Sequence, residues 1–233
     1  MTDLPYRTAL IVGAGPGLSA SLARRLVAAG VRVGLAARNV EKLSSLAEET
    51  GAALFQADGA DPTSVERLFV QADESIGEPD LVVYNASARV RGRIVDLDPE
   101  QVRRALEVSA FGGLLVVQQA ARRMIPKQHG AILFTGATAS IKGFPLSAAF
   151  AMGKFALRGL AQSAARELGP QGVHVAHVLV DGGIRSATRP NPADRPDSLL
   201  DPDGVAQAYL DLLRQPRSAW TFELDLRPWT ESF

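Results

Sequence analysis

Residues 9–26 read A-L-I-V-G-A-G-P-G-L-S-A-S-L-A-R-R-L, and they carry the clearest signal of fold in the sequence. The first four residues form a continuous apolar run, which is typical of a strand covered on both faces of a parallel sheet. Gly13, Gly15 and Gly17 follow, and a helical pattern begins directly after them. Glycines let the backbone approach a pyrophosphate, and the start of a helix offers free N–H groups and a positive dipole. The stretch therefore predicts a strand, a phosphate-binding turn and a helix, although a tight turn without a ligand also favours glycine.

Short apolar runs alternate with longer helical patterns along the rest of the chain. The predicted strands are Thr8–Val12, Arg32–Ala36, Ala53–Phe55, Leu81–Tyr84, Ala131–Thr135, His174–Val180 and Phe222–Leu226. The predicted helices are Ser19–Ala29, Val40–Glu49, Pro62–Ser75, Pro99–Met124, Leu146–Leu168 and Pro202–Arg214. This alternation predicts an α/β fold, a doubly wound parallel sheet of about seven strands with helices on both faces. We expect residues 1–233 to form one domain, with a mobile loop at about 188–198, where Pro and Asp are frequent.

Three of the predicted helices open with the same dipeptide, Asp-Pro. These are Asp61-Pro62, Asp98-Pro99 and Asp201-Pro202. An aspartate can accept hydrogen bonds from the first free N–H groups of a helix, and proline suits the first helical position because no donor is needed there. The dipeptides therefore predict where these helices begin.

Composition excludes several classes of function. The 233 residues carry 25 Lys and Arg against 25 Asp and Glu, so no overall field attracts nucleic acid or an anionic membrane. The chain has no cysteine, and its three histidines are not spaced as a metal set, so we expect no metal site. The opening M-T-D-L-P-Y-R does not resemble a signal peptide, and no apolar run approaches the roughly 20 residues that span a bilayer. We therefore expect a cytoplasmic protein.

Segments further along the chain resemble the short-chain dehydrogenase/reductase family in order and spacing. They are Gly13-x-x-x-Gly17-x-Ser19, Ala57-Asp58, Tyr84-Asn85-Ala86-Ser87 and Asp181-Gly182-Gly183-Ile184-Arg185-Ser186. The resemblance covers nearly the whole chain and implies a Rossmann-type domain that binds a nicotinamide dinucleotide. It implies a cofactor site made of Gly13, Gly15, Gly17, Leu18, Arg38, Asp58, Asn85, Ala86, Lys154, Gly182, Ile184 and Ser186. The family usually has glycine at the position of Ser19, whose side chain could cap the following helix.

The end of the second predicted strand indicates which dinucleotide is preferred. An acidic residue there would bind both ribose hydroxyls of NAD, whereas an arginine suits the 2′-phosphate of NADP. Ala37 removes the carboxylate and Arg38 supplies the cation, so the sequence predicts a preference for NADP(H) over NAD(H). The alternative is that Arg38 merely solvates a loop.

The family's catalytic positions are largely substituted. Its members use a tyrosine and a lysine at i and i+4 on one helical face, a serine after the fifth strand and an asparagine on a preceding helix. Lys154 matches the lysine, but Phe150 stands at the tyrosine position, Ala137 at the serine position and Ser109 at the asparagine position. Sliding the register to use Thr138 as the serine leaves Phe150 unchanged. Thr138 and Ser147 are candidates to hold a water that supplies the missing proton.

Two functions fit these residues. The first is an NADP(H)-dependent oxidoreductase with an altered acid–base site, because orientation alone can support hydride transfer to a small-molecule substrate. The alternative is a non-catalytic NADP(H)-binding sensor or scaffold protein. Resemblance also implies a homodimer or homotetramer through the helices predicted at Pro99–Met124 and Leu146–Leu168. Arg89, Arg91 and Arg93 lie in the loop after the fourth strand, where a solvated basic loop is favoured over contact with an anionic substrate.

Overall fold

In the residues that the computed structural model describes, 4–186 and 189–231, seven strands form one parallel sheet in the order β3-β2-β1-β4-β5-β6-β7. The strands are β1 (Thr8–Val12), β2 (Arg32–Ala37), β3 (Ala53–Gln56), β4 (Leu81–Tyr84), β5 (Gly130–Thr135), β6 (Val173–Val180) and β7 (Glu223–Leu226). The helices are α1 (Leu18–Ala28), α2 (Ser44–Thr50), α3 (Pro62–Ser75), α4 (Pro99–Leu106), α5 (Gly112–Met124), α6 (Ala148–Leu168) and α7 (Pro202–Leu213). The predicted fold class is confirmed.

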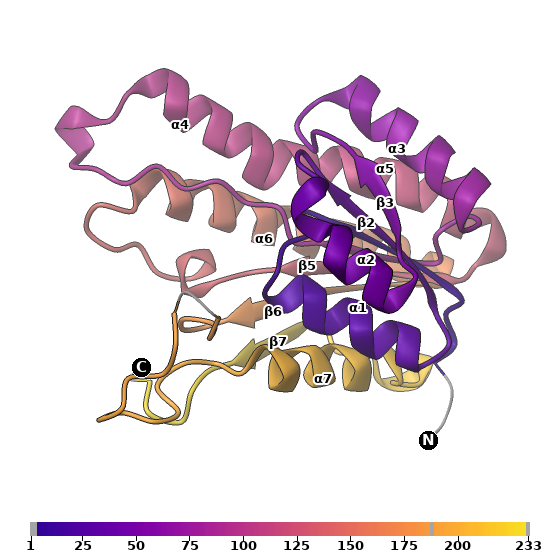
Figure 1. Ribbon diagram of the computed structural model, residues 1–233. Coiled ribbons are helices and arrows are strands. Elements are labelled where there is room, and N and C mark those ends of the chain that lie inside the picture. Colours follow the sequence, from indigo (N-terminus) through magenta and orange to yellow (C-terminus); the bar gives the residue numbers. More distant parts are fainter. Residues whose placement is uncertain (1–3, 187–188, 232–233) are drawn as a thin grey trace.

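Helices cover both faces of the sheet (Figure 1). Alternate residues of β1 enter different cores, because successive side chains of a strand point to opposite faces. Ile11 packs with Leu26 of α1 and Tyr209 of α7 in one core, whereas Leu10 packs with Phe69 of α3 and Leu157 of α6 in the other. Burial on both faces explains why the strand sequences are continuously apolar rather than alternating.

The order of the strands determines where a ligand can bind. Strands β2 and β3 lie on one side of β1, and the chain then crosses over so that β4 lies on the other side of β1. Loops after β1 and β4 therefore leave the sheet in opposite directions, which opens a crevice at the carboxyl ends of these two strands. Ligands of open α/β sheets bind at this kind of position.

The three Asp-Pro dipeptides start helices as predicted. Asp61 accepts a hydrogen bond from the backbone N–H of Ser64 at 2.7 Å. Asp98 and Asp201 each accept one from the residue two positions on, at 2.9 and 3.0 Å. The side chain thus satisfies one of the free donors of each first turn.

The prediction of one α-helix over Pro99–Met124 is wrong in its middle, because Glu107–Phe111 is π-helical and separates α4 from α5. The Tyr84 hydroxyl donates to the Val108 carbonyl oxygen inside this segment. A Cβ on Gly112 would lie 2.3 Å from the backbone oxygen of Gly59. A side chain that donates to a carbonyl oxygen within a helix disrupts the regular backbone hydrogen bonds there. Gly112 permits the close approach of this segment to Gly59.

Other boundaries differ by short segments. The helix predicted over Val40–Glu49 begins as a 3₁₀ turn before α2, and α6 begins two residues later than predicted because Leu146 adopts a left-handed φ of 63°. Residues 189–198 have irregular structure, as predicted, and residue 188 lies outside the described residues. The mobility of this loop stays a prediction.

In the described part of the chain no helix is long and apolar enough to cross a membrane.

Candidate functional site

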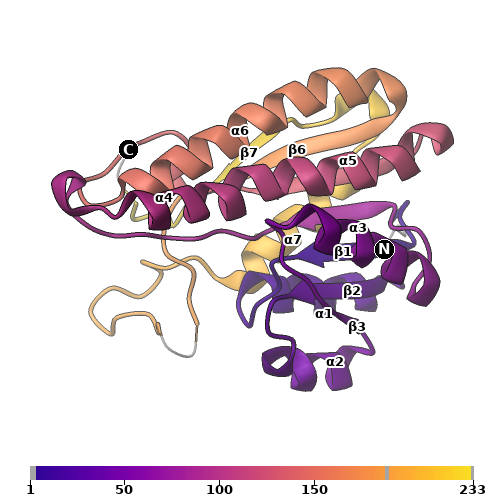
Figure 2. The same cartoon turned by 90° about the horizontal axis from the view of Figure 1, so that it is seen from above.

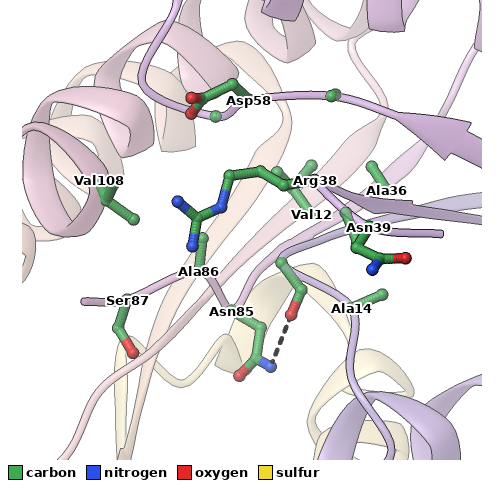
Figure 3. Close-up of a pocket in the computed structure, with 14 residues that line it drawn as sticks. Val12, Ala14, Ala36, Arg38, Asn39, Asp58, Asn85, Ala86, Ser87 and Val108 are labelled. Atoms are coloured by element: carbon green, nitrogen blue, oxygen red, sulfur yellow. Dashed lines mark hydrogen bonds between the residues drawn. The ribbon is translucent and has the colours of Figure 1, made fainter. Parts of the chain in front are cut away.

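A pocket of about 420 Å³ opens at the carboxyl ends of β1, β2, β3 and β4 (Figure 3). It is lined by Val12, Gly13, Ala14, Ala36, Ala37, Arg38, Asn39, Ala57, Asp58, Gly59, Asn85, Ala86, Ser87 and Val108. Five residues of the predicted cofactor site, Gly13, Arg38, Asp58, Asn85 and Ala86, are in this set. Its size lies in the range of small-molecule and cofactor sites.

The glycine turn after β1 leaves room for a ligand. Gly13 has a φ of 85°, and a Cβ there would lie 2.3 Å from the backbone nitrogen of Ala86, so the position requires glycine. Gly15 and Gly17 are different, since no atom lies within 4 Å of where their Cβ would stand. Gly17 is the N-cap of α1, and because glycine has no side chain, this position makes no side-chain capping bond. Open space in front of uncapped N–H groups fits a dinucleotide pyrophosphate.

Asn85 joins two of the loops that form the site. Its Nδ2 donates to the Gly13 carbonyl oxygen at 3.3 Å (Figure 3). The same Nδ2 donates to the Ser19 hydroxyl oxygen at 2.9 Å. Ser19 is buried and is the second residue of α1, after Leu18. The expectation that Ser19 could cap the helix is therefore wrong, because its hydroxyl is used by a residue that folding brings from 66 positions away.

Arg38 follows the last residue of β2 and is exposed, with its side chain extended over the pocket (Figure 3). Among the described residues its guanidinium has no ion pair. Asp58 enters the same pocket from the end of β3, and its carboxylate accepts the backbone N–H of Ala60 at 3.0 Å. The site thus presents an unpaired cation where the sequence predicts the ribose 2′-position.

Lys154 occupies the other end of the candidate site, on α6. Only 3% of the residue is exposed, and its Nζ donates to the Thr135 carbonyl oxygen at 2.7 Å. Burial, and secondly the positive charge of Arg89, lower the pKa of Lys154 from 10.5 to about 8. Lys154 is therefore a buried cation with a defined partner rather than a solvated surface residue.

Phe150 precedes Lys154 by one turn and is 9% exposed. The Nζ of Lys154 lies 5.9 Å from the centre of the Phe150 ring. On the ring face, the guanidinium carbon of Arg89 lies 4.2 Å from the same centre, a cation–π contact. No local sequence pattern indicates this contact, because Arg89 lies in the loop after β4 and Phe150 lies on α6.

Ser109, at the predicted asparagine position, is fully buried in the π-helical segment. Its hydroxyl oxygen accepts the backbone N–H of Ala88 at 3.1 Å, so it fixes the loop that follows β4. A Cβ on Gly153 would lie 2.7 Å from the Cβ of Ser109, which shows how closely α6 packs against this segment. The position of the family's asparagine therefore holds a structural hydroxyl here.

The remaining candidate hydroxyls are not equivalent. Ala137 has no side-chain oxygen, and its backbone N–H donates to the Ser140 hydroxyl at 3.1 Å. The Thr138 hydroxyl donates to the buried carboxylate of Asp181 at 2.5 Å. Ser147 is the N-cap of α6 but makes no side-chain capping bond. Of the two proposed substitutes, Thr138 is already engaged by a carboxylate.

The segment after β6 lies at the same edge of the sheet. Gly182 has a φ of 141°, and a Cβ there would lie 2.9 Å from the Pro228 side chain, so glycine is required. Ile184 forms a bridge with Leu200. The backbone N–H of Ser186 donates to the carbonyl oxygen of Arg189 at 3.0 Å. These contacts hold the predicted nicotinamide-binding segment against residues that follow β7 and precede α7.

A buried ionisable group, the imidazole of His177, lies near Lys154, and no motif in the sequence indicated it. His177 of β6 is fully buried, and its Nδ1 lies 3.0 Å from Glu223 of β7. Arg158 of α6 donates twice to the same carboxylate, both at 2.7 Å. Burial lowers the pKa of His177, and hydrogen bonding from Arg158 lowers the pKa of Glu223. The sequence feature that could have indicated this group of charges is the i, i+4 spacing of Lys154 and Arg158, which places two cations on one face of α6.

Comparisons with known proteins agree with this geometry. A family model described as short chain dehydrogenase matches residues 7–194. An uncharacterized oxidoreductase of Staphylococcus aureus (strain MW2) is 31% identical over 237 residues, which cover 98% of this chain and 100% of that protein.

Solved structures share the fold over nearly their full length. A short-chain dehydrogenase from Rhodopseudomonas palustris is 34% identical with a TM-score of 0.83, covering 96% of this chain and 99% of that one. An alcohol dehydrogenase from the archaeon Thermococcus sibiricus, complexed with 5-hydroxy-NADP, is 26% identical with a TM-score of 0.84, covering 97% and 98%.

Proposed function

This chain belongs to the short-chain dehydrogenase/reductase family, and from that premise we propose that it is an NADP(H)-dependent oxidoreductase with an altered acid–base site. The observation that carries the proposal is the exposed Arg38 guanidinium, which has no ion pair among the described residues and extends over a pocket beside an open glycine turn. A guanidinium suits a phosphate better than a ribose hydroxyl. The Thermococcus sibiricus relative, complexed with 5-hydroxy-NADP, supports a phosphorylated dinucleotide.

Each end of the dinucleotide has a proposed set of contacts. The turn at Gly15 and Gly17 would bind the pyrophosphate. Arg38 would bind the 2′-phosphate, and Asp58 would contact the edge of the adenine. Lys154 would bind the nicotinamide ribose, and Ile184 would contact the nicotinamide ring. When bound, NADPH supplies the hydride for reduction of a small-molecule substrate.

The protein's own contribution to the reaction is mainly orientation and charge. Phe150 and Ala137 offer no proton donor, and a missing general acid typically lowers a rate by about 100- to 10,000-fold. Lys154 has a pKa of about 8, so its ammonium group is mostly charged at neutral pH and favours negative charge developing nearby. The proposed enzyme therefore reduces simple ketones slowly and suits substrates that need little help from a protein acid.

The second candidate is a sensor or scaffold that binds NADPH without turning it over. It is favoured by the Arg89 guanidinium, which covers the ring where a tyrosine hydroxyl would act. A direct NADPH titration combined with a screen of carbonyl, enone and imine substrates separates the two candidates. Binding with turnover supports the oxidoreductase, and binding without turnover supports the sensor. Absence of NADPH binding would contradict both.

We also propose that the protein assembles as a homodimer or homotetramer through α6 and the segment Pro99–Met124, which comprises α4, the π-helical segment and α5. These elements lie side by side (Figure 2). Their outer side carries Phe111, Leu114, Met152 and Phe155, which are 44%, 38%, 52% and 45% exposed. Exposed apolar side chains gathered on neighbouring helices are typical of an interaction surface.

A further inference from the structure

Two cations lie close to the ring of Phe150, and a third, Arg189, lies near Arg89. The guanidinium carbon of Arg89 lies 4.2 Å from the ring centre, and the Nζ of Lys154 lies 5.9 Å from it. Arg189 approaches from the loop after β6. A Cβ on Gly183 would lie 2.4 Å from the guanidinium carbon of Arg189, so this side chain lies directly on the backbone of the predicted nicotinamide-binding segment.

Within the described part of the chain, no acidic side chain forms an ion pair with the arginines of this cluster. Among the described residues neither Arg89 nor Arg189 forms an ion pair, whereas Arg123, for example, binds Asp73 at 2.7 Å. Partial burial of the guanidinium, and secondly the charge of Arg189, lower the pKa of Arg89, although both arginine residues as a whole are exposed. Arg89 in turn contributes to the lowered pKa of Lys154. Neighbouring cations favour an anionic ligand, and solvent screens part of the repulsion between these two exposed arginines.

We propose that Arg89 and Arg189 bind the carboxylate of the substrate, and that the substrate is a small oxo acid. This inference rests on the proposed oxidoreductase function. A planar guanidinium binds a carboxylate through two parallel hydrogen bonds, and two guanidinium groups at one site select the acid over neutral analogues. The ring of Phe150 holds the Arg89 guanidinium through the cation–π contact. The residue at the tyrosine position therefore orients the charge of Arg89 instead of donating a proton.

The position of the arginines fits a reaction next to the bound carboxylate. Arg89 lies over the ring of Phe150, the residue at the tyrosine position, and Arg189 lies against Gly183 of the predicted nicotinamide-binding segment. The reacting carbonyl would then lie between the two arginines. In the reaction the carbonyl carbon gains a hydride, the oxygen takes a proton from water, and both electrons come from the reduced cofactor. The oxo acid becomes a hydroxy acid, and the nearby cations stabilise the negative oxygen as it forms.

Calorimetry on the NADPH-saturated protein tests the inference without relying on turnover. The probes are 2-, 3- and 4-oxo acids, each paired with its amide. We expect at least one acid to bind on the order of 10- to 100-fold more tightly than its amide, as charge-assisted hydrogen bonds imply. Arg89→Gln and Arg189→Gln should each remove most of this difference. Arg91→Gln, an exposed change in the same loop, should preserve it.

Each other outcome has a definite meaning. If no acid binds more tightly than its amide, or if Arg91→Gln removes the preference as strongly as Arg89→Gln does, the inference is wrong. If the two arginine variants weaken NADPH binding and leave the acid preference intact, the arginines serve the cofactor and the inference is also wrong. If acids bind selectively but none is reduced, the carboxylate site stands and the oxidoreductase proposal fails.

Discussion

Lys154 and Phe150 lie one turn apart on α6, with the lysine Nζ 5.9 Å from the centre of the phenylalanine ring. The same Nζ donates its hydrogen bond to the Thr135 carbonyl oxygen. The helix thus presents the lysine and an aromatic ring at the i, i+4 spacing expected from the sequence for the family's lysine and tyrosine, but the ring has no hydroxyl. The missing atom can be restored by mutation, which makes its importance measurable.

Restoring the phenol by Phe150→Tyr, with Ala137→Ser to orient the substrate oxygen, should raise ketone reduction by about 100-fold or more, because a positioned acid contributes that much. The measurement is steady-state NADPH oxidation with an activated diketone. Phe155→Tyr is the control, since it adds a phenol to the same helix at an exposed position. Rapid reduction by the unmodified protein that the added tyrosine does not improve would mean that another group already supplies the proton.

Lys154→Met should weaken NADPH binding by about tenfold or more, because a charge-assisted hydrogen bond to the ribose is lost while the apolar stem is kept. Titration calorimetry of the two proteins at pH 7 provides the comparison. Arg158→Met is a suitable control, as it removes a cation from the next turn of α6 that pairs with Glu223 instead. Unchanged affinity in Lys154→Met would place the nicotinamide ribose elsewhere.

The buried Lys154 should also make folding depend on pH. Its pKa is about 8 in the folded protein against 10.5 when unperturbed, so the unfolded chain holds the proton more tightly between these values. The free energy of unfolding of the unmodified protein, relative to Lys154→Met, should therefore rise as pH increases from 8 to 10.5. Below about pH 8 the difference should level off at its lowest value, because Lys154 is then protonated in both the folded and the unfolded chain. The full change is roughly 3 kcal/mol at most.

Urea unfolding of both proteins at pH 7 and pH 10 measures this difference. Comparison with the variant is needed because burial also raises the pKa of Tyr84 and Tyr209, which lowers stability at high pH in both proteins. A difference that stays constant between the two pH values would show that Lys154 is not desolvated in solution.

Arg38→Ala should largely abolish the preference for NADPH over NADH. The contact with the 2′-phosphate contributes roughly 1.5–3 kcal/mol, which corresponds to about 10- to 100-fold in affinity. Calorimetry with both cofactors measures the ratio. Lys42→Ala removes an exposed cation from the turn that follows and should leave the ratio unchanged. Equal binding of the two cofactors by the unmodified protein would contradict the assignment of Arg38.

The oligomer should dissociate when charge is placed on its proposed interface. Met152→Glu with Phe155→Glu would bury two unpaired carboxylates in an apolar contact, which is strongly unfavourable. Light scattering at micromolar concentration should change from a dimer or tetramer mass to that of a monomer. Val70→Glu is the control, because Val70 is an equally exposed apolar residue on α3. A monomeric mass for the unmodified protein would reject the interface.

Local patterns determined most of the fold. Apolar runs identified all seven strands to within one residue, and the Asp-Pro dipeptides marked the first residue of α3, α4 and α7. The glycine turn after β1 indicated the phosphate loop, and the order of segments indicated the family. These features are readable because strand burial, helix capping and tight turns depend on residues that are close in sequence.

Contacts between distant segments were decided only by the tertiary structure. Ser19 pairs with Asn85, the Tyr84 hydroxyl takes the Val108 carbonyl inside a predicted helix, and Arg89 covers the ring of Phe150. In each case the local pattern allows several partners, and the choice depends on which loops the parallel sheet brings to the same edge. The sequence therefore determines which side chains are present at the site, whereas packing determines which of them meet and where a charge is left without a partner.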